Sequence, residues 1–422
     1  MKKYLPWLLL SLFCFLVSLS KPFVHGLEPP ALVIPLQQLR EYGRILSLAA
    51  LGALAYVTLG KKAQFFRTST PKPLQYLWIL QGVIFCKAFL FGDSQTALLL
   101  FLTYTFLIWV MRRGVLVWIY RDGFDAANLS MITVAVIFVV LNTCQALIST
   151  APLTVINGQF SGTTNNPQML VITLVPLIPC LLFKLEDKSS SKLGKAFFIA
   201  TLVVMFYFVW WSASRTGLIM AVASVIFFYR FRQGPLFRTA AILALVAAFI
   251  LPYFSPTLLS GGDGSLSMLG KLQGGTDTRT EVWQTLLNSF YENPLFGTPI
   301  QGGRLGFGEN TWLSVAATTG LIGLLPLLLF AYEALKMIIK LLTISRRQSV
   351  YAVQCNTVIA GIVTIFVGSF FEALILGVLT TPILALLIFL LLGNYIIYCS
   401  YQFPGGIPIL SPGCLAPEAS PR

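Results

Sequence analysis

Twelve apolar stretches of about 20 residues dominate this sequence, and their length constrains the fold more than any other feature. A helix needs about 20 mostly apolar residues to cross the hydrocarbon core of a bilayer. The pattern therefore predicts an all-α polytopic membrane protein with about 12 transmembrane helices. The predicted spans cover residues 4–22, 39–60, 74–92, 94–111, 126–148, 168–184, 196–213, 216–231, 238–256, 309–335, 350–373 and 381–400.

The composition excludes the other broad classes of protein. Hydrophobic residues make up 56% of the chain and charged residues 10%, whereas an ordinary soluble domain carries about 25% charged residues. Even a large soluble domain leaves about a quarter of its unfolded surface exposed, so it cannot hide this much apolar surface. A soluble enzyme, a disordered chain and a secreted disulfide scaffold are excluded. The seven cysteines form no CxxC pair and are best explained as small apolar filler.

The distribution of basic residues predicts the topology. With a cytoplasmic N-terminus, 21 of the 29 lysines and arginines fall on the inner side and seven on the outer side, with Lys87 inside the third span. This bias places both termini in the cytoplasm. The positive charge is scattered over short inner loops, which excludes nucleic acid as a partner. No clean cleavage site follows the first stretch before Lys21, so we expect a retained span rather than a signal peptide. We therefore predict a transmembrane domain over residues 1–400 and a cytoplasmic tail over residues 401–422.

Two predicted outer segments, 149–167 and 257–308, are too long to be simple turns. The second contains an apolar pattern at helical spacing, with Asp277, Thr278 or Thr280 as the candidate cap. Asn293-Pro294 ends the pattern and Gly297 allows a turn. The sequence thus predicts an amphipathic helix on the outer membrane surface, between spans nine and ten. Its apolar positions are Val282, Trp283, Leu286, Leu287 and Phe290.

Arg215 is the clearest candidate for chemistry. It lies in the tight predicted turn between spans seven and eight, surrounded by the hydroxyls of Ser212, Ser214 and Thr216. Charge at membrane depth is costly and points to function. The planar guanidinium pairs bidentately with phosphate oxygens, which favours a phosphate ligand. The alternative is an arginine that reaches the lipid headgroups.

Two further outer arginines flank the predicted surface helix. Arg279 begins this helix, where the alternative is a solvated cation mildly disfavoured by the helix dipole. Arg304 lies in GGRLGFG, where glycines permit close approach to a ligand. Its alternative is a plain loop charge.

Glu309 and Asn310 directly precede the tenth span. Glu309 is either a carboxylate stabilised by the helix dipole, with Asn310 as the cap, or a general base that faces an outer cavity. Lys87, Asp93 and Glu372 are further polar residues at membrane depth, and for Lys87 we expect an ion pair with a carboxylate on another span. His25 is the single histidine, which excludes a His-based metal cluster and a Ser-His-Asp triad.

Four stretches resemble the bacterial O-antigen ligase and polymerase superfamily. FSGTTNNPQMLVITLVPLIP (160–179) is similar to the family's F-x-G…N-P-N segment, and SASRTG (212–217) to its S-x-S-R-x-G turn. TRTEVWQTLLNSFYENPLFG (278–297) is similar to its R…W…P-x-x-G segment, and ENTWLSVAATTGLIGLLPLL (309–328) to its H-N-x-x-L…G-x-x-G segment. Glu372, Thr381-Pro382 and a last span also fit. The resemblance covers about 160–385, a little over half the chain.

Two departures from the family pattern matter, and the first favours a polymerase over a ligase. Ligases of the family usually have a histidine where this chain has Glu309, and polymerases vary more at that position. The family also often has a basic residue where this chain has Gln159.

The resemblance implies a GT-C-like fold in the bacterial inner membrane, with one large periplasmic loop. It implies an inverting glycosyl transfer that polymerises oligosaccharide repeat units linked to undecaprenyl diphosphate, onto a glycan or lipid-linked acceptor. Membrane lipid and a chain-length regulator protein are the further expected partners, and no cofactor or metal is expected. The implied catalytic residues are Arg215 and Arg279, which stabilise the leaving diphosphate, and Glu309, which deprotonates the acceptor. The implied substrate-binding residues are Asn166, Ser214, Trp283, Arg304 and Asn310.

Three alternatives remain open. One is ligation of the finished glycan to lipid A-core, because no sequence feature identifies the acceptor. Another is a flippase or transporter of lipid-linked oligosaccharides, although such proteins tend to show repeat symmetry that this sequence lacks. The last is a structural membrane scaffold, which Arg215 disfavours.

Overall fold

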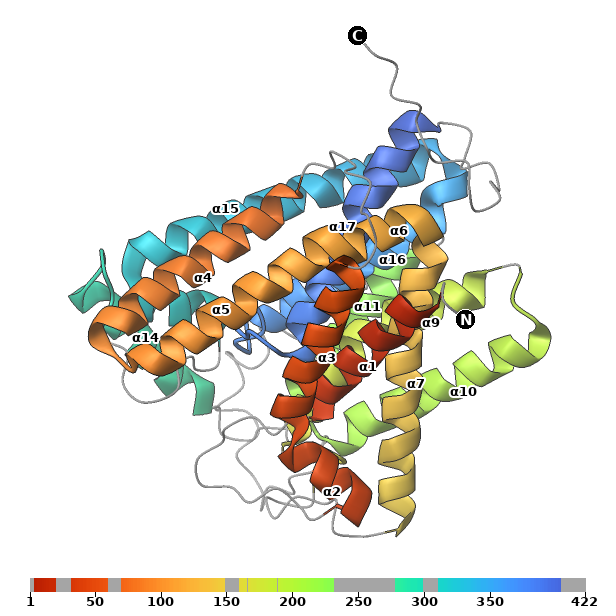
Figure 1. The fold of residues 1–422 in the computed structure, drawn as a ribbon, viewed down its shortest axis with the longest axis horizontal. Helices are drawn as coiled ribbons and strands as arrows, with labels where there is room; N and C mark the ends of the chain where they lie inside the picture. Colours follow the sequence, from red (N-terminus) through yellow and green to blue (C-terminus); the bar gives the residue numbers. More distant parts are fainter. Residues whose placement is uncertain are drawn as a thin grey trace, which may run out of the picture.

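The computed structural model describes residues 4–19, 32–59, 70–148, 159–164, 166–187, 189–230, 278–298 and 310–403. These residues form helices joined by loops, as the sequence predicts (Figure 1). Within these described ranges, eight helical segments are long and apolar enough to cross a membrane, and a pair bent by 70° makes up to nine. The fold is therefore consistent with a polytopic membrane protein.

In chain order the elements are α1 (Leu5–Leu19), α2 (Ile34–Glu41), α3 (Gly43–Leu59), α4 (Lys72–Phe91), α5 (Ser94–Val110), the π-helical η1 (Met111–Val115), α6 (Leu116–Asp122), α7 (Phe124–Ile148), α8 (Pro167–Leu174), the 3-10 segment η2 (Val175–Leu177), α9 (Ile178–Glu186), α10 (Lys192–Trp211), α11 (Arg215–Tyr229), α14 (Thr278–Glu292), α15 (Thr311–Arg347), the 3-10 segment η3 (Ser349–Tyr351), α16 (Ala352–Ser369) and α17 (Thr381–Gln402).

Most predicted spans agree with these helices where the two can be compared. The span predicted over 39–60 is instead two helices, α2 and α3, bent by 70° where they meet at Tyr42, and the span predicted to end at 373 ends at Ser369. Two other spans are longer than predicted. The span predicted to end at 111 continues through η1 and α6 to Asp122, and the span predicted to end at 335 continues to Arg347. Neither continuation contains a proline, so the helix goes on past the apolar stretch. Residues 231–277 lie outside the described residues and include the predicted span 238–256. The total of twelve spans therefore stays a prediction.

The apolar helix α17 is the centre of the bundle. Nearly all of its side chains are buried, and it packs against α16, α15, α6, α7 and α1. Two helix pairs flank it, α11 with α16 and α4 with α15. The predicted surface helix is present as α14, which packs against α15 and lies beside the end of α4 in Figure 1.

A break at Gly320 divides α15 and joins it to the segment that follows α14. Gly320 has φ 61° and ψ −156°, so the helical hydrogen bonds across it are lost. The N–H of Leu321 donates instead to the carbonyl of Pro294, at 2.8 Å, and the N–H of Thr298 donates to the carbonyl of Ala317, also at 2.8 Å. The exchange satisfies backbone groups that would otherwise be unpaired at membrane depth.

Lys87 on α4 completes this exchange. Its ammonium donates to the carbonyl oxygens of Phe296 and Thr318. Lys87 was expected to pair with a carboxylate on another span, and this prediction is wrong: its partners are two backbone carbonyl oxygens. The physical reason is the break at Gly320, because the Thr318 carbonyl has lost its helical partner and the carbonyl dipoles solvate the charge.

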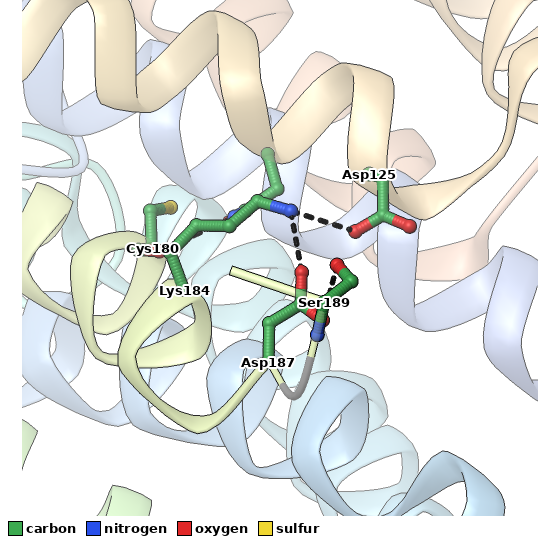
Figure 2. Close-up of polar contacts among 6 residues, drawn as sticks. Asp125, Cys180, Lys184, Asp187 and Ser189 are labelled. Carbon is green, nitrogen blue, oxygen red and sulfur yellow. Dashed lines mark hydrogen bonds and ion pairs between the residues drawn. The ribbon is translucent and has the colours of Figure 1, made fainter. Parts of the chain in front are cut away.

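A second polar cluster ties the end of α9 to the start of α7. Lys184 lies 2.8 Å from a carboxylate oxygen of Asp187 and 3.5 Å from one of Asp125, as Figure 2 shows. Partial burial on its own would raise the pKa of Asp187, but hydrogen bonds from Lys184 and Ser189 outweigh it and hold the pKa below its usual value. These contacts fix the end of the α8–α9 span that lies away from residue 166.

We expect Gly320→Ala to destabilise the fold. A β-carbon at Gly320 would lie 2.4 Å from the backbone of Leu295, and the positive φ alone costs about 1–3 kcal/mol for a residue with a side chain. The thermal unfolding midpoint in detergent should fall by several degrees.

Gly52→Ala in α3 is the matched control. A β-carbon there meets nothing within 4 Å, so the helix should gain about 0.5–1 kcal/mol. An unchanged midpoint for Gly320→Ala would show that the break does not anchor the segment after α14.

Candidate functional site

The turn between α10 and α11 presents Arg215 at a helix start. Ala213 has φ 50°, an uncommon value for a residue with a side chain, and its strain shapes the turn. Ser214 is buried, and its hydroxyl accepts a hydrogen bond from the N–H of Gly217 at 3.1 Å as the helix cap. Arg215 is the first residue of α11 and is half-buried. The turn thus places a guanidinium beside the positive end of a helix dipole.

Arg279 of α14 reaches this same turn. Its Nη2 donates to the hydroxyl of Thr216 at 3.0 Å and to a carboxylate oxygen of Glu372 at 3.0 Å. The Arg279 and Glu372 side chains are each only 14% exposed, so water screens this ion pair weakly. The guanidinium also lies 5.6 Å from the centre of the Phe371 ring, within cation–π range. Arg279 therefore contacts the residue that directly follows Arg215 in the chain.

Four aromatic side chains lie around Arg279 and the segment that contains Glu372. Trp283 lies one turn after Arg279 on α14, and its ring centre is 6.4 Å from that of Phe371. Trp312 at the start of α15 stacks on Phe370, with ring centres 5.5 Å apart, and donates its indole N–H to Ser369 at 3.0 Å. Large apolar rings of this kind lower the local dielectric and strengthen the electrostatic interactions of the arginines.

Asn310 marks where α15 enters the site. Its buried side chain accepts hydrogen bonds from the N–H groups of Trp312 and Leu313, so it caps the helix as the sequence predicts. Its φ is 146°, and it and Ala213 are the two non-glycine residues of positive φ in the described part of the chain. The next residue, Thr311, donates its hydroxyl to the carbonyl of Glu372 at 3.0 Å. The predicted site residues Arg304 and Glu309 lie outside the described residues.

The segment 159–166 packs on the same side of the bundle. Phe160 stacks on Trp211 with ring centres 4.3 Å apart, and its N–H donates to the carbonyl of Trp211. Asn166 caps α8 by accepting from the N–H of Gln168 at 2.8 Å. The starts of α8 and α11 then lie against each other, because a β-carbon at Gly217 would fall 1.9 Å from Val171. The four stretches of the resemblance therefore contribute to one region.

The structure brings together some predicted site residues more tightly than others. Arg215, Ser214 and Arg279 share the turn after α10, with Trp283 and Asn310 close by through Phe371 and Thr311. Asn166 lies on the neighbouring helix α8. Asn166, Ser214 and Asn310 each use their side-chain oxygen as a helix cap, so their contact with substrate stays a prediction.

Sequence reasoning missed three features of this site. Nothing in the sequence indicates that Arg279 contacts Thr216 or Phe371. Glu372 stood out as a charge at membrane depth, but its partner is 93 residues away in the chain.

Within the described ranges, no three His, Cys, Asp or Glu side chains form a group that could hold a metal ion.

The fold and this region define a helical, multi-pass membrane protein with arginines gathered at one end of the bundle. Residues 200–328 match the family model described as O-antigen ligase. That match supports placement of the chain in the O-antigen ligase and polymerase superfamily. Among curated proteins, none matches the chain.

The Arg279–Glu372 ion pair should hold α14 to the bundle. Glu372→Gln is expected to lower the free energy of opening α14 by about 1.5–3 kcal/mol, the value of a hydrogen bond to a charged group. Hydrogen–deuterium exchange of the α14 peptide measures this, and a double-mutant cycle with Arg279→Gln isolates the pair.

Glu333→Gln provides the control. Glu333 pairs with Lys336, whose side chain is 43% exposed, so its loss should cost only about 0–1 kcal/mol and leave α14 unaffected. A coupling energy near zero between Arg279 and Glu372 would contradict the prediction.

Proposed function

We propose that the protein is a membrane glycosyltransferase that polymerises oligosaccharide repeat units linked to undecaprenyl diphosphate, at the periplasmic face of the bacterial inner membrane. The observation that carries the proposal is the meeting of Arg279 with the turn that holds Arg215, at the N-terminus of α11. Two guanidinium groups and a helix N-terminus form a binding site suited to a diphosphate. The family match supports a lipid-linked glycan as the substrate class.

The proposed reaction is a single displacement. The acceptor hydroxyl attacks the anomeric carbon of the donor, the bond from that carbon to the phosphate oxygen breaks, and undecaprenyl diphosphate leaves with the electron pair. The hydroxyl proton passes to a base, and the anomeric centre inverts. Arg215 and Arg279 stabilise the negative charge that develops on the leaving phosphate. Because the guanidinium of Arg279 is already fixed by Thr216 and Glu372, little reorganisation is needed in the transition state.

Glu309 is the proposed base. It directly precedes Asn310, and Thr311 is hydrogen-bonded to the backbone of Glu372, beside Arg279. Arg304 is proposed as a further contact to the diphosphate, and Asn166, Ser214, Trp283 and Asn310 as contacts to the sugars. Trp283 suits this role because its half-buried ring can stack on a sugar face.

Reconstitution of the full-length protein in vesicles with lipid-linked repeat units tests the proposal. We expect a ladder of chain lengths without any added acceptor. Arg279→Ala and Arg215→Ala should each lower the rate by about 10²–10³, the range for a lost oxyanion-stabilising donor. Arg279→Lys should recover only part of the rate, because the ammonium lacks the planar fork.

Arg347→Ala, an exposed arginine at the far end of α15, is the matched control and should keep full activity. Full activity of both the Arg215→Ala and the Glu309→Gln variants would contradict the proposed mechanism. Product formed only when lipid A-core is supplied would identify a ligase instead. Transfer of substrate across the membrane without bond cleavage would identify a transporter.

A further inference from the structure

A hollow apolar groove lies at the opposite end of α14 from Arg279. It has a volume of about 460 Å³ and is lined by α4, α5, α15 and the segment after α14. Its lining atoms are almost all apolar, and Lys87 is its one charged residue. Representative lining residues are Trp78, Val83 and Leu90 of α4, Phe101 of α5, Ile322 of α15 and Phe296.

The groove differs from an ordinary lipid-facing surface in two ways. Phe296, from the segment after α14, lines the groove and is 67% exposed, so its ring is not packed against other side chains. Lys87 is held in place by two carbonyl oxygens, yet an ammonium has three donors. Among the described residues no acceptor takes its third N–H. A fixed cation beside an apolar hollow complements a lipid whose hydrocarbon chain ends in a phosphate.

The separation of the two sites indicates which lipid this is. Lys87 and Arg279 are held by different partners, Lys87 by the carbonyls of Phe296 and Thr318 and Arg279 by Thr216 and Glu372, so we assign them to two different phosphates. In the proposed reaction the donor's phosphate lies at the bond that breaks. The reacting hydroxyl of the acceptor is at its non-reducing end, so the acceptor's own phosphate lies a whole repeat unit away. A second lipid site, separate from the one at Arg279, fits the acceptor.

We propose that the groove between α4, α5 and α15 binds the isoprenoid chain of the lipid-linked acceptor, with its phosphate at Lys87. The proposal rests on the proposed function for the identity of the acceptor. The binding of a polyprenyl phosphate in the groove is testable without any glycosyl transfer.

The probe is a photoreactive, diazirine-bearing analogue of undecaprenyl phosphate, added to the full-length protein in vesicles of phosphatidylcholine. We expect cross-links to peptides from α4 and α5. Gly82→Leu and Val83→Trp, two variants that fill the groove, should each weaken labelling by about tenfold, or about 1.4 kcal/mol of binding free energy. A β-carbon at Gly82 meets only Phe101, at 3.8 Å, so the first variant should fold. Leu99→Trp is the control, since Leu99 is 60% exposed on α5 and does not line the groove.

Competition identifies the ligand. Unlabelled undecaprenyl phosphate should displace the probe, and undecaprenol, which lacks the phosphate, should displace it less well. Displacement by phosphatidylglycerol to the same extent would overturn the proposal, because the groove would then hold ordinary membrane lipid. Labelling that survives in both groove-filling variants would also overturn it.

Three further outcomes separate this inference from the proposed function. Arg215→Ala, which leaves the Arg279–Glu372 pair in place, should lower the rate of glycosyl transfer by about 10²–10³ and leave the labelling intact, which supports two independent lipid sites. Groove-filling variants that lose labelling but elongate glycan at the normal rate would overturn the acceptor assignment while the proposed function stands. Labelling in the groove of a protein that transfers no sugar would overturn the proposed function, and the acceptor role with it.

Discussion

The exchange of backbone hydrogen bonds at Gly320 is the constraint on which the placement of α14 depends. A membrane helix must satisfy every backbone polar group within the protein, so a break in α15 requires outside partners. The segment 294–298 and Lys87 supply them. This requirement fixes the far end of α14, and the ion pair with Glu372 fixes its near end. The helix that carries Arg279 and Trp283 is thus held at both ends.

The candidate site shows how strain and pairing position charge. Ala213 and Asn310 hold unfavourable backbone angles immediately before the helices that carry Arg215 and Trp312. Such strain persists only where the surroundings over-determine the conformation, and here helix caps and aromatic stacking do so. Glu372 orients Arg279 by accepting a hydrogen bond from its Nη2. Electrostatic stabilisation of a leaving group relies on this kind of fixed geometry.

Local patterns in the sequence predicted the helices well, but they could not predict contacts between residues far apart in the chain. The α14 helix, its end at Asn293-Pro294 and the turn at Gly297 follow from residues close together in the chain. The capping role of Asn310 is also local. The partner of Arg279 lies 93 residues away, and those of Lys87 more than 200. No periodicity encodes such pairs, and the break at Gly320 that gives Lys87 its carbonyl partners is hidden within an apolar stretch.

Lys87 also bears on the order in which the protein is built. It is 209 residues before Phe296 and 231 before Thr318, so α4 enters the membrane long before either carbonyl exists. At about 5–20 residues per second, synthesis of the 209 intervening residues takes roughly 10–40 s. Lys87 lies four residues before the end of α4, so its insertion costs less than the about 2.5–3.5 kcal/mol of a lysine at a helix centre. The leucines and phenylalanines of α4 must offset this cost in the meantime. The charge is satisfied only when the segment after α14 docks on the broken α15, so this contact closes late in biogenesis.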